Sequence, residues 1–334
     1  MTEQSGEFDI IRRFFAPLTR DFSGAYSLLD DAACLDVPPD QQLMITTDCL
    51  VAGVHFFDTD PADSIAAKLL SANLSDLASM GATAQVYTLA VAWPQPVDVE
   101  WIRVFAEGLE LSQQQYGVHL IGGDTVASPS PLTLTVTAMG TVAKGKGLLR
   151  STANGGDLVY VSGTIGDAAL GLDILNAGRE GVSGLDATDA ESLIARYRTP
   201  TARCRLGQHL VGIASACIDI SDGLLSDLGH LVKASGVQVD IHLTDVPLSE
   251  AARRMITDSP LSAHRILNGG DDYELLFTVP PEQETTLIEL SKKLGIQLTS
   301  IGILSVSQSD KEDVRVFDGN GTLLSLENTG YRHF

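Results

Sequence analysis

The chain has 334 residues, and 44% of them are hydrophobic, which is enough to bury the cores of two ordinary domains without disulfide bonds. Its 43 acidic residues outnumber the 22 basic ones and give a formal net charge of −21. This balance argues against nucleic acid or an anionic membrane as a partner, because both need a basic face. The acidic excess is explained equally well by solubility and by carboxylates that bind metal.

The four cysteines are spaced as in a protein of a reducing compartment. They form no C-x-x-C pair, and their spacing suggests neither a zinc site nor a disulfide framework. The first nine residues are polar and acidic, unlike a signal peptide, and no apolar run reaches roughly 18 residues. We therefore expect a cytoplasmic protein with no membrane span. The cysteines are Cys34, Cys49, Cys204 and Cys217.

Helical and strand patterns alternate along the first half of the chain, which predicts mixed α and β structure. A short buried strand is expected at 43–46, ending at Thr47-Asp48. A helix then opens at Asp60-Pro61 and stops at Gly81, a glycine suited to end it. Further elements are expected as a strand at 85–93, a helix at 99–116, a short strand at 118–121 and a half-buried strand at 132–139.

A boundary is predicted in the stretch 144–156, which holds several glycines, three basic residues and few large apolar ones. It separates an expected N-terminal domain at 1–145 from a C-terminal domain at 150–334. Glycine-acid strings at 122–124 and 269–271 give only a weak hint that the two halves share an ancestor. The second half predicts strands at 158–161, 217–220, 237–243 and 274–279, helices at 167–176, 202–214, 222–234 and 282–294, and two or three final strands.

Several aspartates stand where a buried strand is expected to end or a helix to begin. Carboxylates near apolar segments are costly to bury unless they are paired or bound to metal. Oxygen ligands of this kind suit Mg²⁺, which prefers one or two carboxylates together with substrate phosphates. The alternative is that each aspartate is a separate turn or cap residue. The aspartates are Asp31, Asp48, Asp124, Asp219 and Asp222.

Asp76 carries a different signal. The helix that contains it is mostly small and apolar, yet Asn73 and Asp76 stand three residues apart and share one face. Metal coordination by Asp76 explains such a polar pair, and a satisfied core hydrogen bond is the competing interpretation.

Conventional nucleotide and nucleophile motifs are absent. The segment 140–147 reads G-T-V-A-K-G-K-G and matches the first part of a P-loop, but Gly147 stands where the Ser or Thr hydroxyl would bind Mg²⁺. We interpret it as an interdomain loop, with Arg150 just beyond it as a possible phosphate contact.

A series of short strings runs in order from near residue 30 to the last residue. Each string alone is weak, but the ordered set is specific. The strings are Asp30-Asp31-Ala32-Ala33, Thr46-Thr47-Asp48, Val51-Ala52-Gly53-Val54-His55-Phe56, Asn73-Leu74-Ser75-Asp76-Leu77-Ala78-Ser79-Met80-Gly81, Ile121-Gly122-Gly123-Asp124-Thr125, Arg150-Ser151, Ile218-Asp219-Ile220-Ser221-Asp222-Gly223-Leu224, Gly269-Gly270-Asp271-Asp272-Tyr273-Glu274-Leu275 and Gly330-Tyr331-Arg332-His333-Phe334. Together they resemble the thiamine-monophosphate kinase family, of the superfamily that includes aminoimidazole ribonucleotide synthetase and selenophosphate synthetase.

The resemblance implies an α/β (α+β) fold of two domains, like that of aminoimidazole ribonucleotide synthetase. The N-terminal sheet would form the interface of a homodimer, and a C-terminal α/β domain would close over the nucleotide. The implied reaction is ATP-dependent phosphorylation of thiamine monophosphate to thiamine diphosphate, assisted by several Mg²⁺ ions.

The resemblance also implies roles for individual residues. Implied metal ligands are Asp31, Thr46, Thr47, Asp48, Asp76, Asp124, Asp219 and Asp222. The implied ATP contacts are Tyr116, Gly123, Asp124, Arg150 and Ser221, and the implied contacts for thiamine monophosphate are His55, Asp271 and Tyr331.

Two positions depart from the family pattern. Leu29 stands where a glycine usually precedes the first Asp-Asp, which leaves the role of Asp30 open, and Asp271 replaces the usual glutamate. Two implied substrate contacts also have simpler interpretations, because His55 could be packed beside its aromatic neighbours and Tyr331 could anchor the C-terminus.

Other activities fit less well. Selenophosphate synthetase has a reactive Cys or selenocysteine near its N-terminus, and this chain has none before Cys34. Hydrogenase-maturation relatives carry a C-terminal cysteine, whereas this chain ends in Phe334. A non-catalytic regulator that binds nucleotide or thiamine has little need of so many aspartates.

The chemistry of the implied acceptor assigns a role to the aspartates. The second pKa of a phosphate monoester is about 6, so the acceptor is largely ionised at neutral pH and needs no strong general base. The difficulty is that two anions must meet in line, which metal ions relieve by bridging the phosphates. We therefore expect the aspartates to be ligands rather than proton acceptors.

Overall fold

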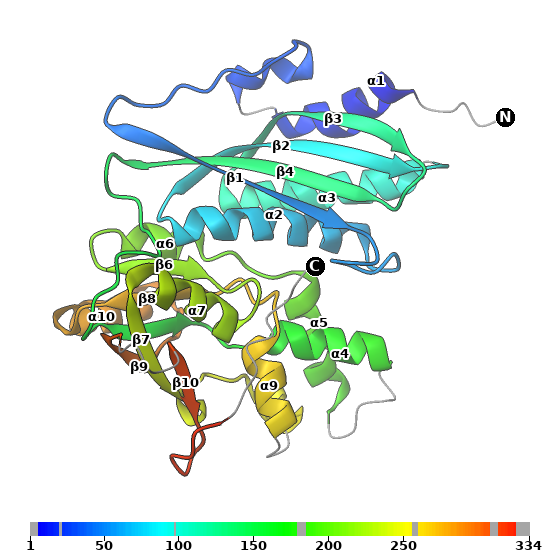
Figure 1. Ribbon diagram of the computed structural model, residues 1–334. Coiled ribbons are helices and arrows are strands. Elements are labelled where there is room, and N and C mark those ends of the chain that lie inside the picture. Colours follow the sequence, from blue (N-terminus) through cyan, green and yellow to red (C-terminus); the bar gives the residue numbers. More distant parts are fainter. Residues whose placement is uncertain are drawn as a thin grey trace. The chain divides into compact units, whose positions relative to one another are not determined.

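The computed structural model describes residues 6–19, 22–96, 98–178, 185–255, 260–307 and 313–324. The chain divides into two compact units, each with its own β-sheet (Figure 1). Unit 1 comprises Met1–Leu77 and Ala82–Gly145, and unit 2 comprises Ala78–Gly81 and Lys146–Phe334.

Unit 1 contains a four-stranded sheet in the order β1-β4-β2-β3. Strand β4 is antiparallel to both β1 and β2, and β2 is parallel to β3. Strands β1 and β3 are therefore the two edges of this sheet. The strands are β1 (Gln41–Val51), β2 (Thr83–Pro94), β3 (His119–Ser128) and β4 (Thr133–Ala143).

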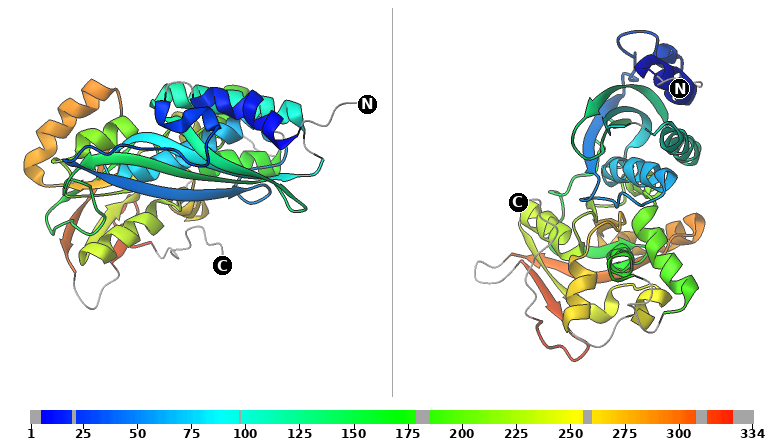
Figure 2. Two further views of the ribbon diagram at one scale, coloured as in Figure 1. Left: turned by 90° about the horizontal axis from the view of Figure 1, so that it is seen from above. Right: turned by 90° about the vertical axis from the view of Figure 1, so that its right-hand side faces the viewer.

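Helices α2 (Ala62–Ser79) and α3 (Val99–Tyr116) lie side by side along one face of this sheet (Figures 1 and 2). Their inner faces bury apolar side chains such as Leu70 and Phe105. The bounds predicted for the helix at 99–116 are confirmed. They could be predicted because the sequence places a capping residue at each end of the helix. The Asp98 side chain accepts hydrogen bonds from the first-turn amides, and Gly117 takes the left-handed conformation at φ 70°.

Short helical turns precede the sheet of unit 1 and were not predicted. They are α1 (Glu7–Ile10), a π-helical turn (Ile11–Phe15) and two 3₁₀ turns (Ala16–Thr19 and Ser23–Leu28). The Gln113 side chain of α3 donates to the carbonyl of Leu18 at 3.0 Å, which ties this segment to the helical layer.

Unit 2 contains a six-stranded sheet in the order β10-β7-β9-β5-β8-β6. Only the β10–β7 pair is parallel, and the other neighbours are antiparallel. The strands are β5 (Leu158–Ser162), β6 (Ala216–Asp219), β7 (Val237–His242), β8 (Leu275–Val279), β9 (Leu298–Val306) and β10 (Val314–Phe317).

The main core of unit 2 lies between its sheet and α7, where Leu228 and Leu231 pack with Val161, Val239 and Leu276. A second apolar cluster joins α4, α5 and α8. Three helices, α5, α8 and α9, were not predicted. The helices are α4 (Asp167–Ala177), α5 (Ala187–Arg198), α6 (Cys204–Leu210), α7 (Leu224–Ser235), α8 (Glu250–Met255), α9 (Pro260–Asn268) and α10 (Glu284–Leu294).

Three sequence expectations need correction. Strand β1 continues to Val51, so Asp48 lies inside a strand rather than after its end, and β3 runs to Ser128, so Asp124 is also inside a strand. Both strands are sheet edges, where a polar side chain keeps access to water without ending the strand. The segment interpreted as an interdomain loop is partly strand, because β4 extends to Ala143.

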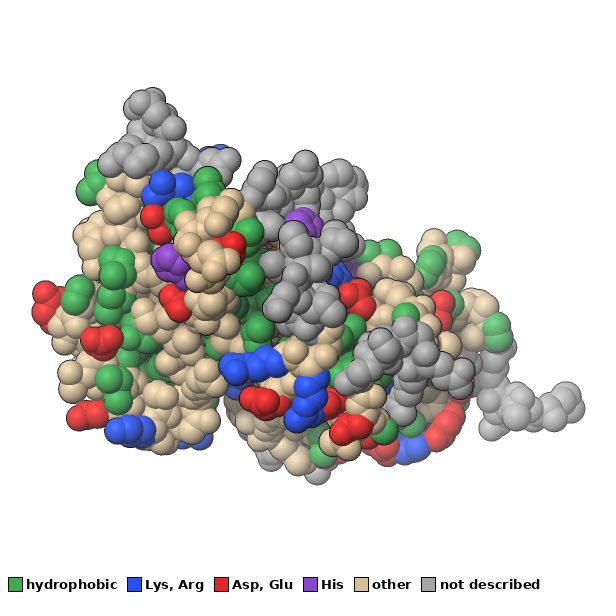
Figure 3. All heavy atoms as spheres, turned by 90° about the horizontal axis from the view of Figure 1, so that it is seen from below, with side chains coloured by type: hydrophobic (Ala, Val, Ile, Leu, Met, Phe, Trp, Pro, Cys, Tyr) green, Lys and Arg blue, Asp and Glu red, His purple; other side chains and the backbone are tan. Residues whose placement is uncertain are grey.

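None of the helices in the described ranges has the length and apolar character needed to span a bilayer. On the face drawn in Figure 3, Lys and Arg side chains are interspersed with Asp and Glu side chains.

Candidate functional site

In unit 1, β1 and α2 bring two predicted metal ligands into contact. Thr46 Oγ1 donates a hydrogen bond to Asp76 Oδ2, and the Asp48 backbone N–H donates to Asn73 Oδ1 at 3.0 Å. The Asn73 side chain is fully buried and also donates to the carbonyl of Leu69 at 2.9 Å. Asn73 is therefore a satisfied core hydrogen-bonding residue that fastens β1 to α2, while Asp76 stays partly exposed beside Thr46.

The Thr47 side chain forms hydrogen bonds with β4 rather than with α2. Its hydroxyl donates to the Val136 carbonyl at 2.9 Å and lies 3.1 Å from the Thr137 hydroxyl. Successive side chains of a strand point to opposite faces, so Thr47 does not share the face of Thr46 and Asp48.

A pocket of about 170 Å³ in unit 1 collects a second group of predicted residues. Asp31, Gly123 and Asp124 line it together, along with Asp30 and an apolar wall. The segment around 31 and strand β3 are distant in the sequence, so the fold has brought these carboxylates to one cavity.

The turn before this pocket explains how the chain does without the family's usual glycine. Leu29 has φ −100°, which any residue adopts, and it is 86% exposed. The left-handed conformations fall one step earlier, at Tyr26, Ser27 and Leu28, with φ between 50° and 57°. Glycine is therefore not required at position 29.

Gly123 has no room for a side chain. A Cβ at this position would stand 1.9 Å from the Leu89 carbonyl oxygen on β2, whereas a Cβ at Gly122 would meet only a Thr88 methyl group at 3.7 Å. We expect Gly123→Ala to lower the free energy of unfolding by about 1–3 kcal/mol, because the strands must move apart.

Gly122→Ala is the matched control for that substitution and should stay near the wild-type stability. Urea denaturation of both variants checks the prediction. Equal stability of the two alanine variants would show that the backbone contact at Gly123 is unimportant.

His55 and Tyr116 each have a specific contact in unit 1. His55 Nδ1 accepts a hydrogen bond from the Val51 backbone N–H at 3.0 Å, so the ring is oriented rather than merely packed. Tyr116, the last residue of α3, places its hydroxyl 3.1 Å from the Ser71 hydroxyl on α2.

In unit 2, predicted residues follow the end of β6. Asp219 is the last residue of that strand, and Ser221 and Asp222 follow it after Ile220. Asp227 on α7 fixes this loop, because its Oδ2 accepts from the backbone N–H of Ser221 at 3.0 Å and of Asp222 at 3.1 Å. Burial, together with the negative charges of Asp219 and Asp222, raises the pKa of Asp227 to about 8.

Asp227 was not predicted as a functional residue. The Ser-Asp-Leu string that it shares with Asp76 is the signal that could have identified it. Its bonds to two loop amides show that it orients a candidate metal-binding loop.

The loop 269–274 lies beside the same strand end. The Asp271 backbone N–H donates to the Ser221 carbonyl at 2.9 Å, and that of Tyr273 donates to the Ile220 carbonyl at 2.8 Å. The fold thus joins a predicted substrate contact, Asp271, to a predicted ATP contact, Ser221. Asp271 and Tyr273 have positive φ values of 72° and 50°, which side chains tolerate only when the surroundings hold them.

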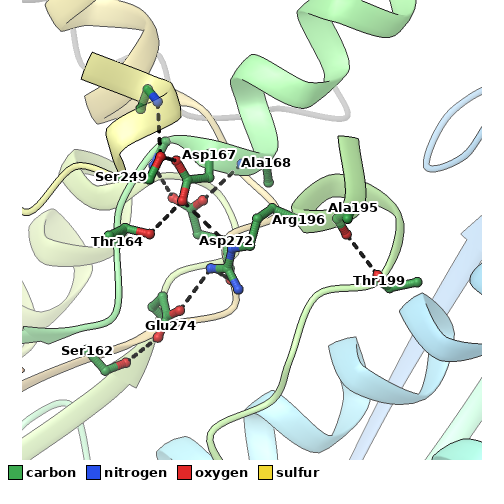
Figure 4. Close-up of polar contacts among 12 residues, drawn as sticks. Ser162, Thr164, Asp167, Ala168, Ala195, Arg196, Thr199, Ser249, Asp272 and Glu274 are labelled. Carbon is green, nitrogen blue, oxygen red and sulfur yellow. Dashed lines mark hydrogen bonds and ion pairs between the residues drawn. The ribbon is translucent and has the colours of Figure 1, made fainter. Parts of the chain in front are cut away.

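Two fully buried carboxylates hold this loop (Figure 4). Asp272 accepts from the Gly166 backbone N–H at 2.7 Å and from that of Ala168 at 3.3 Å. Glu274 accepts from Ser162 Oγ at 2.5 Å, from Arg196 Nη2 at 2.8 Å and from Arg203 Nε at 2.6 Å. We call Asp272, Glu274, Arg196 and Arg203 the loop anchor.

Asp272 makes stability depend on pH. Burial raises the pKa of Asp272 to about 7, although the Gly166 N–H and Arg196 oppose the rise. The folded protein then keeps this proton up to about pH 7, while the unfolded chain loses it near its ordinary value of 3.8. The contribution of Asp272 to stability is therefore full at low pH and decreases as the pH rises through this window.

Asp272→Asn removes that dependence. We expect the stability difference between wild type and variant, measured by urea denaturation, to favour wild type more at pH 5 than at pH 8. A difference that grows toward pH 8 would mean that Asp272 is ionised in the folded protein at neutral pH.

Two predicted residues remain, Arg150 and Tyr331. Arg150 is exposed, and its carbonyl accepts from Ser235 Oγ at 3.0 Å. Tyr331 lies outside the described residues. Across the described ranges, no group of three or more His, Cys, Asp or Glu side chains is arranged to hold a metal ion. The candidate ligands are instead divided between unit 1 and unit 2.

Comparison with known proteins identifies the family. Residues 29–142 match the family described as AIR synthase related protein, N-terminal domain, and residues 154–315 match its C-terminal domain family. The thiamine-monophosphate kinase of Haemophilus influenzae is 41% identical over 330 residues, which cover 98% of each chain. That of Salmonella typhimurium is 43% identical over 331 residues, again 98% of each.

Solved structures agree. The crystal structure of thiamine-monophosphate kinase from Stenotrophomonas maltophilia gives a TM-score of 0.79 at 40% identity, covering 86% of this chain and 89% of that one. A structure described as AaThiL complexed with AMPPCP and TMP gives a TM-score of 0.76 at 28% identity, covering 100% and 99%. The expected two-domain fold is confirmed, and the chain belongs to the thiamine-monophosphate kinase family.

Proposed function

We propose that this chain transfers the terminal phosphoryl group of ATP in line to the phosphate of thiamine monophosphate, assisted by Mg²⁺, to give thiamine diphosphate and ADP in thiamine diphosphate biosynthesis. The observation that carries the activity is the relationship over nearly the full length of both chains to thiamine-monophosphate kinases. The related AaThiL was solved in complex with AMPPCP, a nucleotide analogue, and TMP, which fits ATP and thiamine monophosphate as the two substrates.

The residues present fit Mg²⁺. Their donors are carboxylate and hydroxyl oxygens, which hard divalent ions prefer, and Thr46 and Asp76 are already in contact. Bound Mg²⁺ supplies charge neutralisation for the phosphates. In this proposal the ligands are Asp31, Thr46, Thr47, Asp48, Asp76 and Asp124 in unit 1, and Asp219 and Asp222 in unit 2. Thr47 can join them only through its backbone oxygen, because its side chain lies on the opposite face of β1 and donates to the Val136 carbonyl.

The substrates use the remaining predicted residues. Tyr116, Gly123 and Asp124 in unit 1 and Arg150 and Ser221 in unit 2 are proposed to contact ATP. Gly123 supports this because its bare backbone lines the pocket of unit 1.

His55, Asp271 and Tyr331 are proposed to contact thiamine monophosphate. The acceptor phosphate is largely ionised at neutral pH, so these side chains bind and orient it, and no residue is needed as a general base.

A homodimer formed through the sheet of unit 1 is part of the proposal. The face of β1 opposite α2 exposes Leu43 and Ile45, which are 37% and 61% exposed. Both edges of the four-stranded sheet, β1 and β3, carry proposed ligands, Asp48 and Asp124. Exposed apolar side chains on an open sheet favour burial against a second copy.

Ile45→Lys should therefore shift the protein toward a monomer in size-exclusion chromatography with light scattering. A charge at the centre of the proposed interface is costly to bury. Val306→Lys on β9, also an exposed apolar strand residue, is the control and should leave the mass unchanged. Equal masses of the Ile45→Lys variant and wild type would exclude this face as the interface.

The proposed activity is tested by following ADP release with thiamine monophosphate, with thiamine or with no acceptor. ADP release that requires thiamine monophosphate supports the proposal. Activity with free thiamine alone, or equal ADP release without any acceptor, would overturn it.

A further inference from the structure

Lys68 is a buried lysine in the middle of α2. It is only 1% exposed, and its Nζ donates a hydrogen bond to the backbone carbonyl of His55 at 2.9 Å. Lysine is rarely buried to this extent, because removing its amino group from water is costly unless acceptors replace the water. A lysine buried at this position needs a structural or functional explanation, and one of its contacts is with the turn that carries His55.

That turn follows β1 and is closely fixed. The His55 backbone N–H donates to the Val51 carbonyl at 3.0 Å, and the Gly53 N–H donates to the Phe56 carbonyl at 2.8 Å. Gly53 takes a positive φ of 77°, which lets the chain reverse within a few residues. The contact from Lys68 reaches this turn from the helix side.

The His55 ring is fixed as well. Val51 N–H donates to His55 Nδ1 at 3.0 Å, and an amide N–H can only donate. Nδ1 must therefore be the acceptor nitrogen, and the neutral ring carries its proton on Nε2. His55 is thus arranged to offer an N–H donor from Nε2.

We propose that Lys68 is a positioning residue, which holds the His55 turn so that Nε2–H donates to an acceptor atom of thiamine monophosphate. This inference rests on the proposed role of His55 in binding that substrate. Lys68 on α2 binds the carbonyl of His55, and Val51 on β1 binds the His55 ring. His55 is therefore held by both α2 and β1. Without the Nζ donor, the His55 carbonyl loses a buried partner and the turn can move.

Steady-state kinetics of Lys68→Met provide the first test. Methionine keeps most of the side-chain length and apolar surface but removes the donor. We expect kcat/KM for thiamine monophosphate to fall about 10- to 100-fold, because small displacements of a positioned group are costly. The KM for ATP should stay within about twofold of wild type.

Two further variants separate positioning from packing. Lys68→Arg retains a donor and should recover part of the lost kcat/KM. Leu70→Val, a buried change on the same helix, should lower the melting temperature and leave kcat/KM for thiamine monophosphate unchanged. If Lys68→Met changed the KM values for ATP and thiamine monophosphate equally, the inference would be wrong.

A double-mutant cycle tests whether Lys68 acts through His55. In His55→Asn, Oδ1 can replace Nδ1 as the acceptor for Val51, while the Nε2–H donor is absent. Adding Lys68→Met to this variant should cause no further loss in kcat/KM for thiamine monophosphate. Independent, additive losses would show that Lys68 works in some other way.

Nitrogen NMR of the histidine rings gives a readout that does not depend on turnover, with His55 assigned by its loss in His55→Asn. Wild type should show His55 as the Nε2–H tautomer, and Lys68→Met should show a mixture of tautomers. Identical His55 spectra in both proteins would overturn the positioning role, even if the kinase activity itself were confirmed. Absence of turnover in wild type would instead defeat the proposed function.

Discussion

Asp48→Asn is expected to lower kcat by about 10²- to 10³-fold, which corresponds to losing several kcal/mol of metal-assisted charge stabilisation. The Mg²⁺ concentration that gives half the maximal rate should rise as well. Asparagine keeps the size of the side chain but removes the negative charge that a hard cation prefers. The backbone hydrogen bond from residue 48 to Asn73 does not depend on the side chain, so β1 should stay fastened to α2.

Initial rates measured over a series of Mg²⁺ concentrations check this result. Asp40→Asn makes the same chemical change at an exposed position just before β1 and should behave as wild type. Near-normal turnover of Asp48→Asn at ordinary Mg²⁺ would remove Asp48 from the proposed ligand set.

Glu274→Gln is expected to cause the largest loss of stability, about 3–5 kcal/mol in the free energy of unfolding. Glu274 is fully buried and receives hydrogen bonds from both Arg196 and Arg203. Glutamine cannot balance two guanidinium charges, and its amide would bring further donors toward them. Each arginine side chain keeps about a fifth of its surface exposed, at 21% and 19%, so water offsets part of the loss.

Urea denaturation measures this loss, and Glu284→Gln is its matched control. Glu284 is exposed, and among the residues that the structure describes it accepts a single 3.2 Å hydrogen bond, from the Tyr160 hydroxyl, so its change should be nearly neutral. Because Glu274 also holds the loop of Asp271, the KM for thiamine monophosphate should rise in Glu274→Gln. A stability within about 1 kcal/mol of wild type would mean that the loop anchor is much weaker than its geometry indicates.

Elements with encoded ends could be predicted from the sequence. The helix at 99–116 has a capping aspartate and a terminal glycine, and the strand at 158–161 is a compact apolar run, so both were found with correct or nearly correct bounds. The edge strands were harder. Asp48 and Asp124 interrupt apolar runs, and the sequence does not show that an open sheet edge accepts them inside a strand.

The candidate site was predictable only as a set of motifs. The loop anchor could be predicted only in part. Asp272 and Glu274 belong to the string at 269–275, but Arg196 lies on α5, a helix with no motif of its own, and contacts Glu274 only in the folded chain. The roles of Asp227 and Lys68 likewise depend on burial and on bonds to backbone groups that the sequence does not reveal. Such contacts leave no local pattern, whereas glycine-acid strings do.

The pairing of β1 has a consequence for synthesis on the ribosome. Within the described sheet of unit 1, β1 is hydrogen-bonded to β4 alone, with Gln41 opposite Ala143. During synthesis β1 emerges from the ribosome long before β4. It can therefore pair only after nearly the whole of unit 1 has been synthesised. Until then its polar backbone and its apolar side chains, including Ile45, stay open to other chains. Co-translational folding of unit 1 is therefore vulnerable to a pause or truncation before residue 143.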